Sequence, residues 1–161
     1  MDLVLPDFQS IDLEKLANKV IKEHRKRAKD RGVKLHLDAE RRLPTVSGDA
    51  TSLERALSGL IDNAIKFSPR GENVDIRIRS QLGLVSLSVQ DHGIGISEID
   101  QPRIFDRFHH LEEKDGALFE GIGLGLSITQ QVIKQHHGEL EVESQEEIGS
   151  VFTMKLKASE K

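Results

Sequence analysis

The order of apolar and polar positions along the chain predicts three helices and five strands. Apolar residues recur at helical spacing in three segments, 10–32, 51–67 and 123–137. They alternate with polar residues in five shorter segments, 33–39, 74–80, 84–90, 139–144 and 150–156. Thr51 and Glu54 have the spacing of a capping box at the start of the second helix, and Gly138 is expected to end the third.

The order of these elements favours an α+β fold, a two-layer α/β sandwich. Most strands follow one another as hairpin pairs, and helices do not alternate one for one with strands, which argues against a doubly wound parallel sheet. We therefore expect a mixed five-stranded sheet with about three helices on one face. Residues 91–121 show little periodicity, and an irregular stretch of this length in a compact domain is usually a lid or a binding loop.

Composition narrows the classes of function. The chain has 161 residues, which corresponds to about one domain. Its net charge of −4 argues against nonspecific electrostatic binding to nucleic acid. It has no cysteine, which excludes disulfides and thiolate metal sites. No apolar run approaches the ~18 residues that span a bilayer, and the N-terminus does not resemble a signal peptide. We expect a cytoplasmic, monomeric domain without membrane contact.

A glycine-rich segment, GIGLGLS at 121–127, precedes the third helix. Glycines that enter a helix expose backbone N–H groups at its positive end, which favours an anion, although a hinge or tight packing explains them equally well. The segment is not a dinucleotide-binding fingerprint, because Leu126 stands where the third glycine is required. It also lacks the lysine of a P-loop and the hairpin setting of a protein-kinase glycine loop.

Two further motifs contain polar residues suited to a nucleotide. Asp91 ends an alternating strand in DHGIGI and can accept a hydrogen bond from the amine of a base, although Asp-x-Gly is also common in ordinary turns. Asn63 and Lys66 share a helix face in LIDNAIKFSP. An amide oxygen suits Mg²⁺ and an ammonium suits phosphate, whereas the alternative is a solvated pair without function.

Taken together and in this order, the motifs resemble those of the ATP-binding catalytic domain of bacterial sensor histidine kinases. LIDNAIKFSP resembles the N box, DHGIGI the first glycine box, IFDRFHH the phenylalanine box and GIGLGLSIT the second glycine box. GSVFTMKL resembles the closing strand, so the resemblance covers roughly residues 8–157. It implies the Bergerat-type fold that gyrase, heat-shock 90 and mismatch-repair ATPases share, with residues 10–161 as the catalytic domain.

The resemblance implies a role for each matching position. Asn63 is the expected Mg²⁺ ligand, Lys66 approaches the phosphates, and Asp91 takes the adenine amino group. Residues 97–122 form the expected lid, anchored by Phe105 and Phe108. The full set of expected nucleotide-binding residues is Asn63, Lys66, Phe67, Asp91, Gly93, Gly95, Ile96, Arg107, Phe108, His110, Gly121, Gly123, Leu124, Gly125 and Leu126.

Four positions depart from the family pattern: Gly59, His92, His110 and Ile122. Gly59 stands four residues before Asn63, where hydrolysing relatives have a glutamate that activates water, so the chain is expected to hold Mg-ATP without activating water. His110 replaces a frequent arginine, and Arg103 or Arg107 is the residue expected to compensate.

None of the seven histidines fits the phosphoacceptor pattern, a helical histidine followed directly by Asp or Glu. The resemblance therefore implies γ-phosphoryl transfer to a histidine of a separate dimerising helical hairpin, with residues 1–9 as its residual linker and a response regulator downstream. Two alternatives stay open: a degenerate pseudokinase or interaction module, and a serine kinase of the anti-sigma type.

Overall fold

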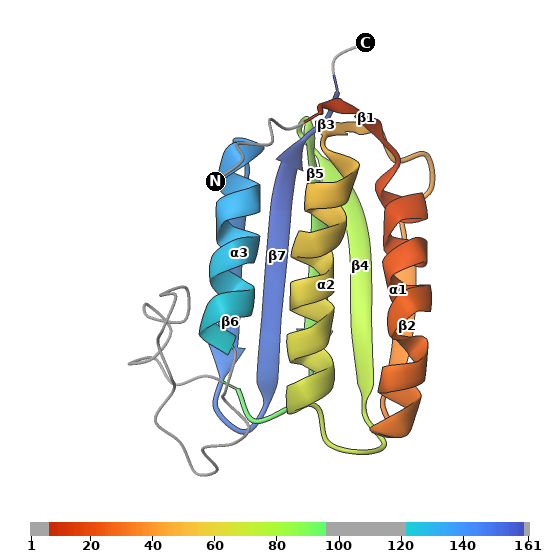
Figure 1. The fold of residues 1–161 in the computed structure, drawn as a ribbon, viewed down its shortest axis with the longest axis vertical. Helices are drawn as coiled ribbons and strands as arrows, with labels where there is room; N and C mark the ends of the chain where they lie inside the picture. Colours follow the sequence, from red (N-terminus) through yellow and green to blue (C-terminus); the bar gives the residue numbers. More distant parts are fainter. Residues whose placement is uncertain (1–6, 96–121, 160–161) are drawn as a thin grey trace.

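In the part of the chain that the structure describes, three helices cover one face of a five-stranded sheet, and no described element covers the other face (Figure 1). The computed structural model describes residues 7–95 and 122–159. The helices are α1 (Leu13–Asp30), α2 (Ala50–Phe67) and α3 (Ile122–Gln135). The strands are β1 (Gln9–Ile11), β2 (Lys34–Ala39), β3 (Val46–Gly48), β4 (Asn73–Gln81), β5 (Leu84–Asp91), β6 (Glu139–Gln145) and β7 (Gly149–Lys157). The predicted α+β sandwich is confirmed.

The five-stranded sheet has the order β2-β4-β5-β7-β6. β2 pairs with β4 in parallel, and the other three pairings are antiparallel, which makes the sheet mixed as expected. The predicted hairpin between β4 and β5 turns at Leu82 and Gly83, whose φ values of 53° and 80° match the left-handed pair that favours tight hairpins. This hairpin sends β5 back along the sheet, so that the strand ends at Asp91 beside the end of α2.

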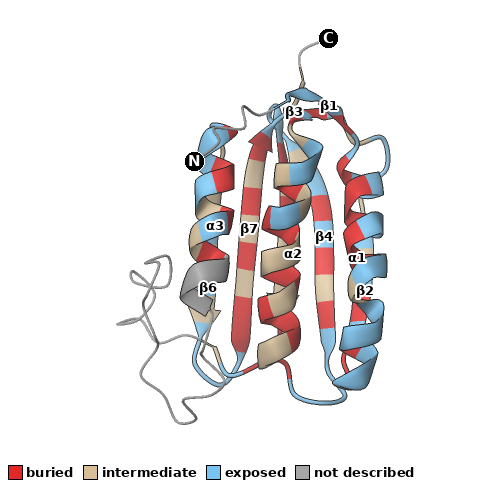
Figure 2. Cartoon of the chain, viewed as in Figure 1, coloured by how far each residue is buried: buried red, intermediate tan, exposed pale blue. Residues whose placement is uncertain are grey.

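The core lies between the helices and the covered face of the sheet (Figure 2). Every second residue of β5 is buried, from Val85 to Asp91, because side chains of a strand alternate between its two faces. α2 contributes the widest buried stripe, and Leu53, Leu57 and Ile61 on it have no measurable exposure. None of the described helices is both long enough and apolar enough to cross a membrane.

Two local expectations are wrong. Thr51 does not cap α2: the helix begins at Ala50, and Asp49 is the cap, because its carboxylate accepts from the backbone N–H of Ser52 at 3.2 Å. α3 ends at Gln135 rather than near 137, and the residue with left-handed backbone is His137 (φ 56°), not Gly138. Gly138 instead avoids a collision, since a Cβ there would lie 2.3 Å from a backbone oxygen of β7.

A second sheet, β1 paired with β3, does not appear in the sequence pattern. Each strand has three residues, too short for a recognisable alternation. The pairing ties the start of the described chain to the segment that leads into α2.

Candidate functional site

The C-terminal end of α2, the end of β5 and the start of α3 lie at the same end of the molecule, the lower end in Figure 1. α2 and β5 run toward this end, whereas α3 begins there. The predicted N box, first glycine box and second glycine box are therefore brought together by the fold, although about 60 residues of sequence separate the first from the last. This end of the molecule is the candidate site.

Asn63 lies on α2 and is buried, with 6% of its surface exposed. Its amide nitrogen Nδ2 has no hydrogen-bond partner among the described residues. Burying an unpartnered amide costs free energy unless a ligand supplies the missing hydrogen bond. Because Asn63 is buried, it is not the solvent-exposed residue that the alternative without function requires. Because the two ends of an amide are interchangeable by rotation, the side chain can equally present its oxygen. The amide oxygen is a suitable ligand for Mg²⁺, which takes one or two protein oxygens and keeps waters and phosphate oxygens as its other ligands.

Asp91 ends β5 and is also buried, with 6% exposed. Its Oδ1 accepts from the backbone N–H of Gly93 at 2.9 Å, so the ordinary turn is present, and the backbone of Ser150 also donates to the carboxylate. Burial raises the pKa of the Asp91 carboxyl, and these two hydrogen bonds oppose the rise. A carboxylate has about four acceptor positions, which leaves capacity for a further donor such as the amine of a base.

The glycines after Asp91 are required by the protein's own backbone. A Cβ on Gly93 would lie 2.0 Å from the carbonyl oxygen of Phe67, and one on Gly95 would lie 2.1 Å from that of Gln145. Gly95 also has a φ of 72°, in the left-handed region. The first glycine box is thus packed between the end of α2 and the turn that joins β6 to β7, which holds Asp91 close to the helix that carries Asn63.

Asp62 precedes Asn63 but faces α1 instead of the site. Its Oδ1 accepts from Arg27 at 2.5 Å, and His24 Nε2 lies 3.3 Å from the same oxygen. Gly59, one turn earlier, has no side chain for proton transfer. In the described part of α2, neither residue is placed to activate a water molecule at Asn63.

Ser68 is a site candidate that the sequence reasoning missed. It caps the C-terminus of α2, is 6% exposed, and its hydroxyl oxygen has no hydrogen-bond partner among the described residues. Serine is common in loops, so its type alone carries no signal; only the fold shows that the hydroxyl is buried beside Phe67. Two cavities lie among the described residues: one of about 620 Å³ at the N-terminal end of α2, away from the site, and one of about 240 Å³ at the end of β5, which Asp91 and His92 line. Asn63 lines neither.

The remaining expected site residues lie at the start of α3, in the last turn of α2, or outside the described residues. α3 begins at Ile122, so the expected phosphate-binding glycines Gly123 and Gly125 lie in its first turn, with Leu124, and Leu126 is fully buried in the core. Lys66 and Phe67 lie in the last turn of α2, and both are partly buried. The other expected residues lie outside the described residues, together with most of the expected lid: Ile96, Arg103, Phe105, Arg107, Phe108, His110 and Gly121.

Comparison with known proteins identifies the family. The family model for "Histidine kinase-, DNA gyrase B-, and HSP90-like ATPase" matches residues 48–160. The sensor-like histidine kinase SenX3 of Mycobacterium tuberculosis (strain ATCC 25618 / H37Rv) is 36% identical over 154 residues, which cover 96% of this chain and 37% of that protein. The chain thus spans less than two-fifths of the length of this relative.

Solved structures agree with this assignment. Full-length ShkA in complex with AMPPNP superposes with a TM-score of 0.84 at 25% identity, over 98% of this chain and 33% of that one. The mycobacterial sensor histidine kinase MprB superposes with a TM-score of 0.81 at 26% identity, over 96% of this chain and 100% of that one. The chain therefore belongs to the histidine kinase-, DNA gyrase B- and HSP90-like ATPase family, and it is an ATP-binding domain of the sensor histidine kinase type.

Proposed function

We propose that this domain binds Mg-ATP between α2, the end of β5 and the start of α3. Asn63 would supply an oxygen ligand to Mg²⁺, Asp91 would accept from the adenine amine, and Lys66 with the first turn of α3 would face the phosphates. The observation that carries the proposal is the pair of buried polar groups, Asn63 with an unpartnered amide nitrogen and Asp91 with acceptor capacity to spare, at the same end of the fold. ShkA, a protein of the same fold, was solved with the nucleotide analogue AMPPNP.

We further propose that the bound γ-phosphoryl goes to a histidine of a helical hairpin in the full-length protein, and from there to a response regulator. The absence of a general base in the described part of α2 supports transfer to a protein nucleophile over hydrolysis, since Gly59 has no side chain and Asp62 is held by Arg27 and His24. Catalysis by this domain would then consist mainly of positioning the nucleotide and neutralising its charge. The cytoplasmic location of the domain stays a prediction.

Substitution of Asn63 by alanine tests the metal assignment. We expect Asn63→Ala to abolish Mg²⁺-dependent binding of a fluorescent ATP analogue while the domain stays folded, because the change removes an unsatisfied buried amide. Asn18→Ala is the matched control: it makes the same change at an exposed position of α1 and should leave binding unaltered. Equal affinity of Asn63→Ala and wild type, with and without Mg²⁺, would refute the assignment.

A test of the reaction uses the domain joined to its own helical hairpin. With Mg-ATP present, we expect acid-labile, base-stable phosphate on a histidine of the hairpin. Nucleotide binding without such phosphate would overturn the transfer step and leave nucleotide binding as the function of the domain.

A further inference from the structure

The contact between α1 and α2 contains a row of polar pairs that ends at the candidate site. The two helices run in the same direction, and residues 35 apart in sequence meet along the row. Lys19 pairs with Glu54 at 2.5 Å, Arg27 pairs with Asp62 at 2.5 Å, and Arg31 donates to the backbone carbonyl of Lys66 at 3.0 Å. On α2 these positions, 54, 62 and 66, are separated by multiples of four residues, so they form one stripe that faces α1.

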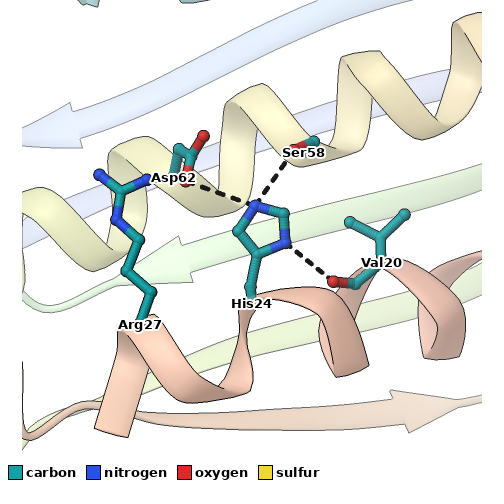
Figure 3. A network of polar contacts seen from close by, with 5 residues as sticks. All are labelled: Val20, His24, Arg27, Ser58 and Asp62. Atoms are coloured by element: carbon teal, nitrogen blue, oxygen red, sulfur yellow. Dashed lines mark hydrogen bonds and ion pairs between the residues drawn. The ribbon is translucent and has the colours of Figure 1, made fainter. Parts of the chain in front are cut away.

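Within this row, Asp62 receives two basic partners (Figure 3). Arg27 Nη1 donates to its Oδ1, and the ring of His24 projects from α1 toward the same carboxylate and toward Ser58. The side chain of His24 is 12% exposed and that of Asp62 is 35% exposed, so the pair is only partly screened by water.

The contacts of His24 show which of its ring nitrogens pairs with Asp62. Nδ1 lies 2.8 Å from the carbonyl oxygen of Val20, which can only accept, so Nδ1 carries a hydrogen. Nε2 faces the carboxylate of Asp62 at 3.3 Å, and a lone pair there would repel the anion. Ser58 Oγ lies 3.1 Å from the same nitrogen and can donate to it when the ring is neutral, whereas only a protonated Nε2 donates to Asp62, which makes His24 an imidazolium ion paired with that carboxylate. The hydrogen bond to Asp62 raises the pKa of His24 in agreement with this geometry.

Asp62 needs compensation because of its position. It is the residue before Asn63 and lies one helical turn before Lys66 on the same stripe. An uncompensated carboxylate at this point would repel an anionic triphosphate and would attract Mg²⁺ and the Lys66 ammonium away from it.

We propose that Arg27 and His24 are positioning residues for nucleotide binding: they hold the Asp62 carboxylate against α1 and keep its charge out of the site of Asn63 and Lys66. This inference rests on the proposed nucleotide site. It assigns to α1, which precedes all the motifs of the family resemblance, a role in the electrostatics of that site.

The test first removes the two partners of the Asp62 carboxylate and then removes the carboxylate itself. In His24→Gln/Arg27→Gln, Asp62 keeps its charge without partners, and we expect the affinity for a fluorescent ATP analogue with Mg²⁺ to fall about three- to tenfold, as for one added unit charge near a partly exposed site. Adding Asp62→Asn should restore the affinity, because no charge remains to be compensated. The melting temperature should stay low in both variants, since neither has the ion pairs between the helices. The loss of affinity should also shrink at high salt.

A control separates this role from simple attachment of the helices. Lys19→Gln breaks the equivalent pair with Glu54, eight residues and about 12 Å along the helix from Asp62, and should leave nucleotide affinity unchanged. If the triple variant binds as weakly as the double variant, Arg27 and His24 act only by holding α1 to α2, and the proposal is wrong. Wild-type affinity in the double variant would also overturn it. Failure of the wild type itself to bind would instead remove the proposed function.

Discussion

Replacement of Asp91 by asparagine should separate the affinity of the site from the stability of the fold. The side chain is 6% exposed, and its Oδ1 already accepts from the backbone N–H of Gly93 at 2.9 Å. Asparagine retains this acceptor but replaces the other oxygen with an NH₂ group, which cannot accept from the adenine amine. A hydrogen bond to a charged group contributes about 1.5–3 kcal/mol, so affinity for ATP should fall about 10- to 150-fold.

The same substitution should not destabilise the domain. Because burial raises the pKa of Asp91, the ionised carboxylate is disfavoured in the folded state. The resulting loss of stability grows as pH rises from the unfolded pKa through the folded pKa and is complete only above the folded pKa. Asp91→Asn should therefore melt at the same or a higher temperature than wild type at pH 7, and the difference should decrease at acidic pH.

Isothermal titration with ATP and with ITP, which lacks the exocyclic amine, provides the assay. Wild type should prefer ATP, and Asp91→Asn should lose most of that preference. An equal loss of affinity for both nucleotides would indicate general damage to the site. ATP affinity within twofold of wild type would refute the assignment of Asp91 to the adenine amine.

Three further substitutions follow from the packing. Gly93→Ala places a Cβ 2.0 Å from the Phe67 carbonyl oxygen and should lower the free energy of unfolding by about 1–3 kcal/mol or more, measured by urea denaturation; an unchanged midpoint would contradict the close approach. His24→Gln should lower the free energy of unfolding by up to about 1 kcal/mol below pH 6.5. This difference should vanish as pH rises through the raised pKa of His24, because wild type loses the ion pair with Asp62 there as well. A difference that does not depend on pH would exclude the ion pair. Ser68→Ala should leave the melting temperature unchanged or higher, since it removes a buried hydroxyl without a partner, whereas a clear drop would reveal one.

The sequence by itself determined the helices and strands, because their periodicities are local properties of the chain. It also determined which residue types serve the candidate site: an amide at 63, a carboxylate at 91 and glycines at the start of α3, in an order typical of one family. The sequence did not predict the N-cap of α2, because Asp49, Thr51 and neighbouring polar residues are competing caps of similar strength. It did not predict β1 and β3, because a strand of three residues is too short to show an alternating pattern.

Only the tertiary structure decided the environment of these residues. Burial of the Asn63 amide depends on how α2 packs against the sheet, and the need for Gly93 depends on the carbonyl oxygen of Phe67. Asp62 is adjacent to Asn63 in sequence, yet its partner Arg27 comes from a helix 35 residues earlier. Contacts of this kind join residues far apart along the chain, and a sequence pattern reports which face a side chain occupies but not which residue it meets there.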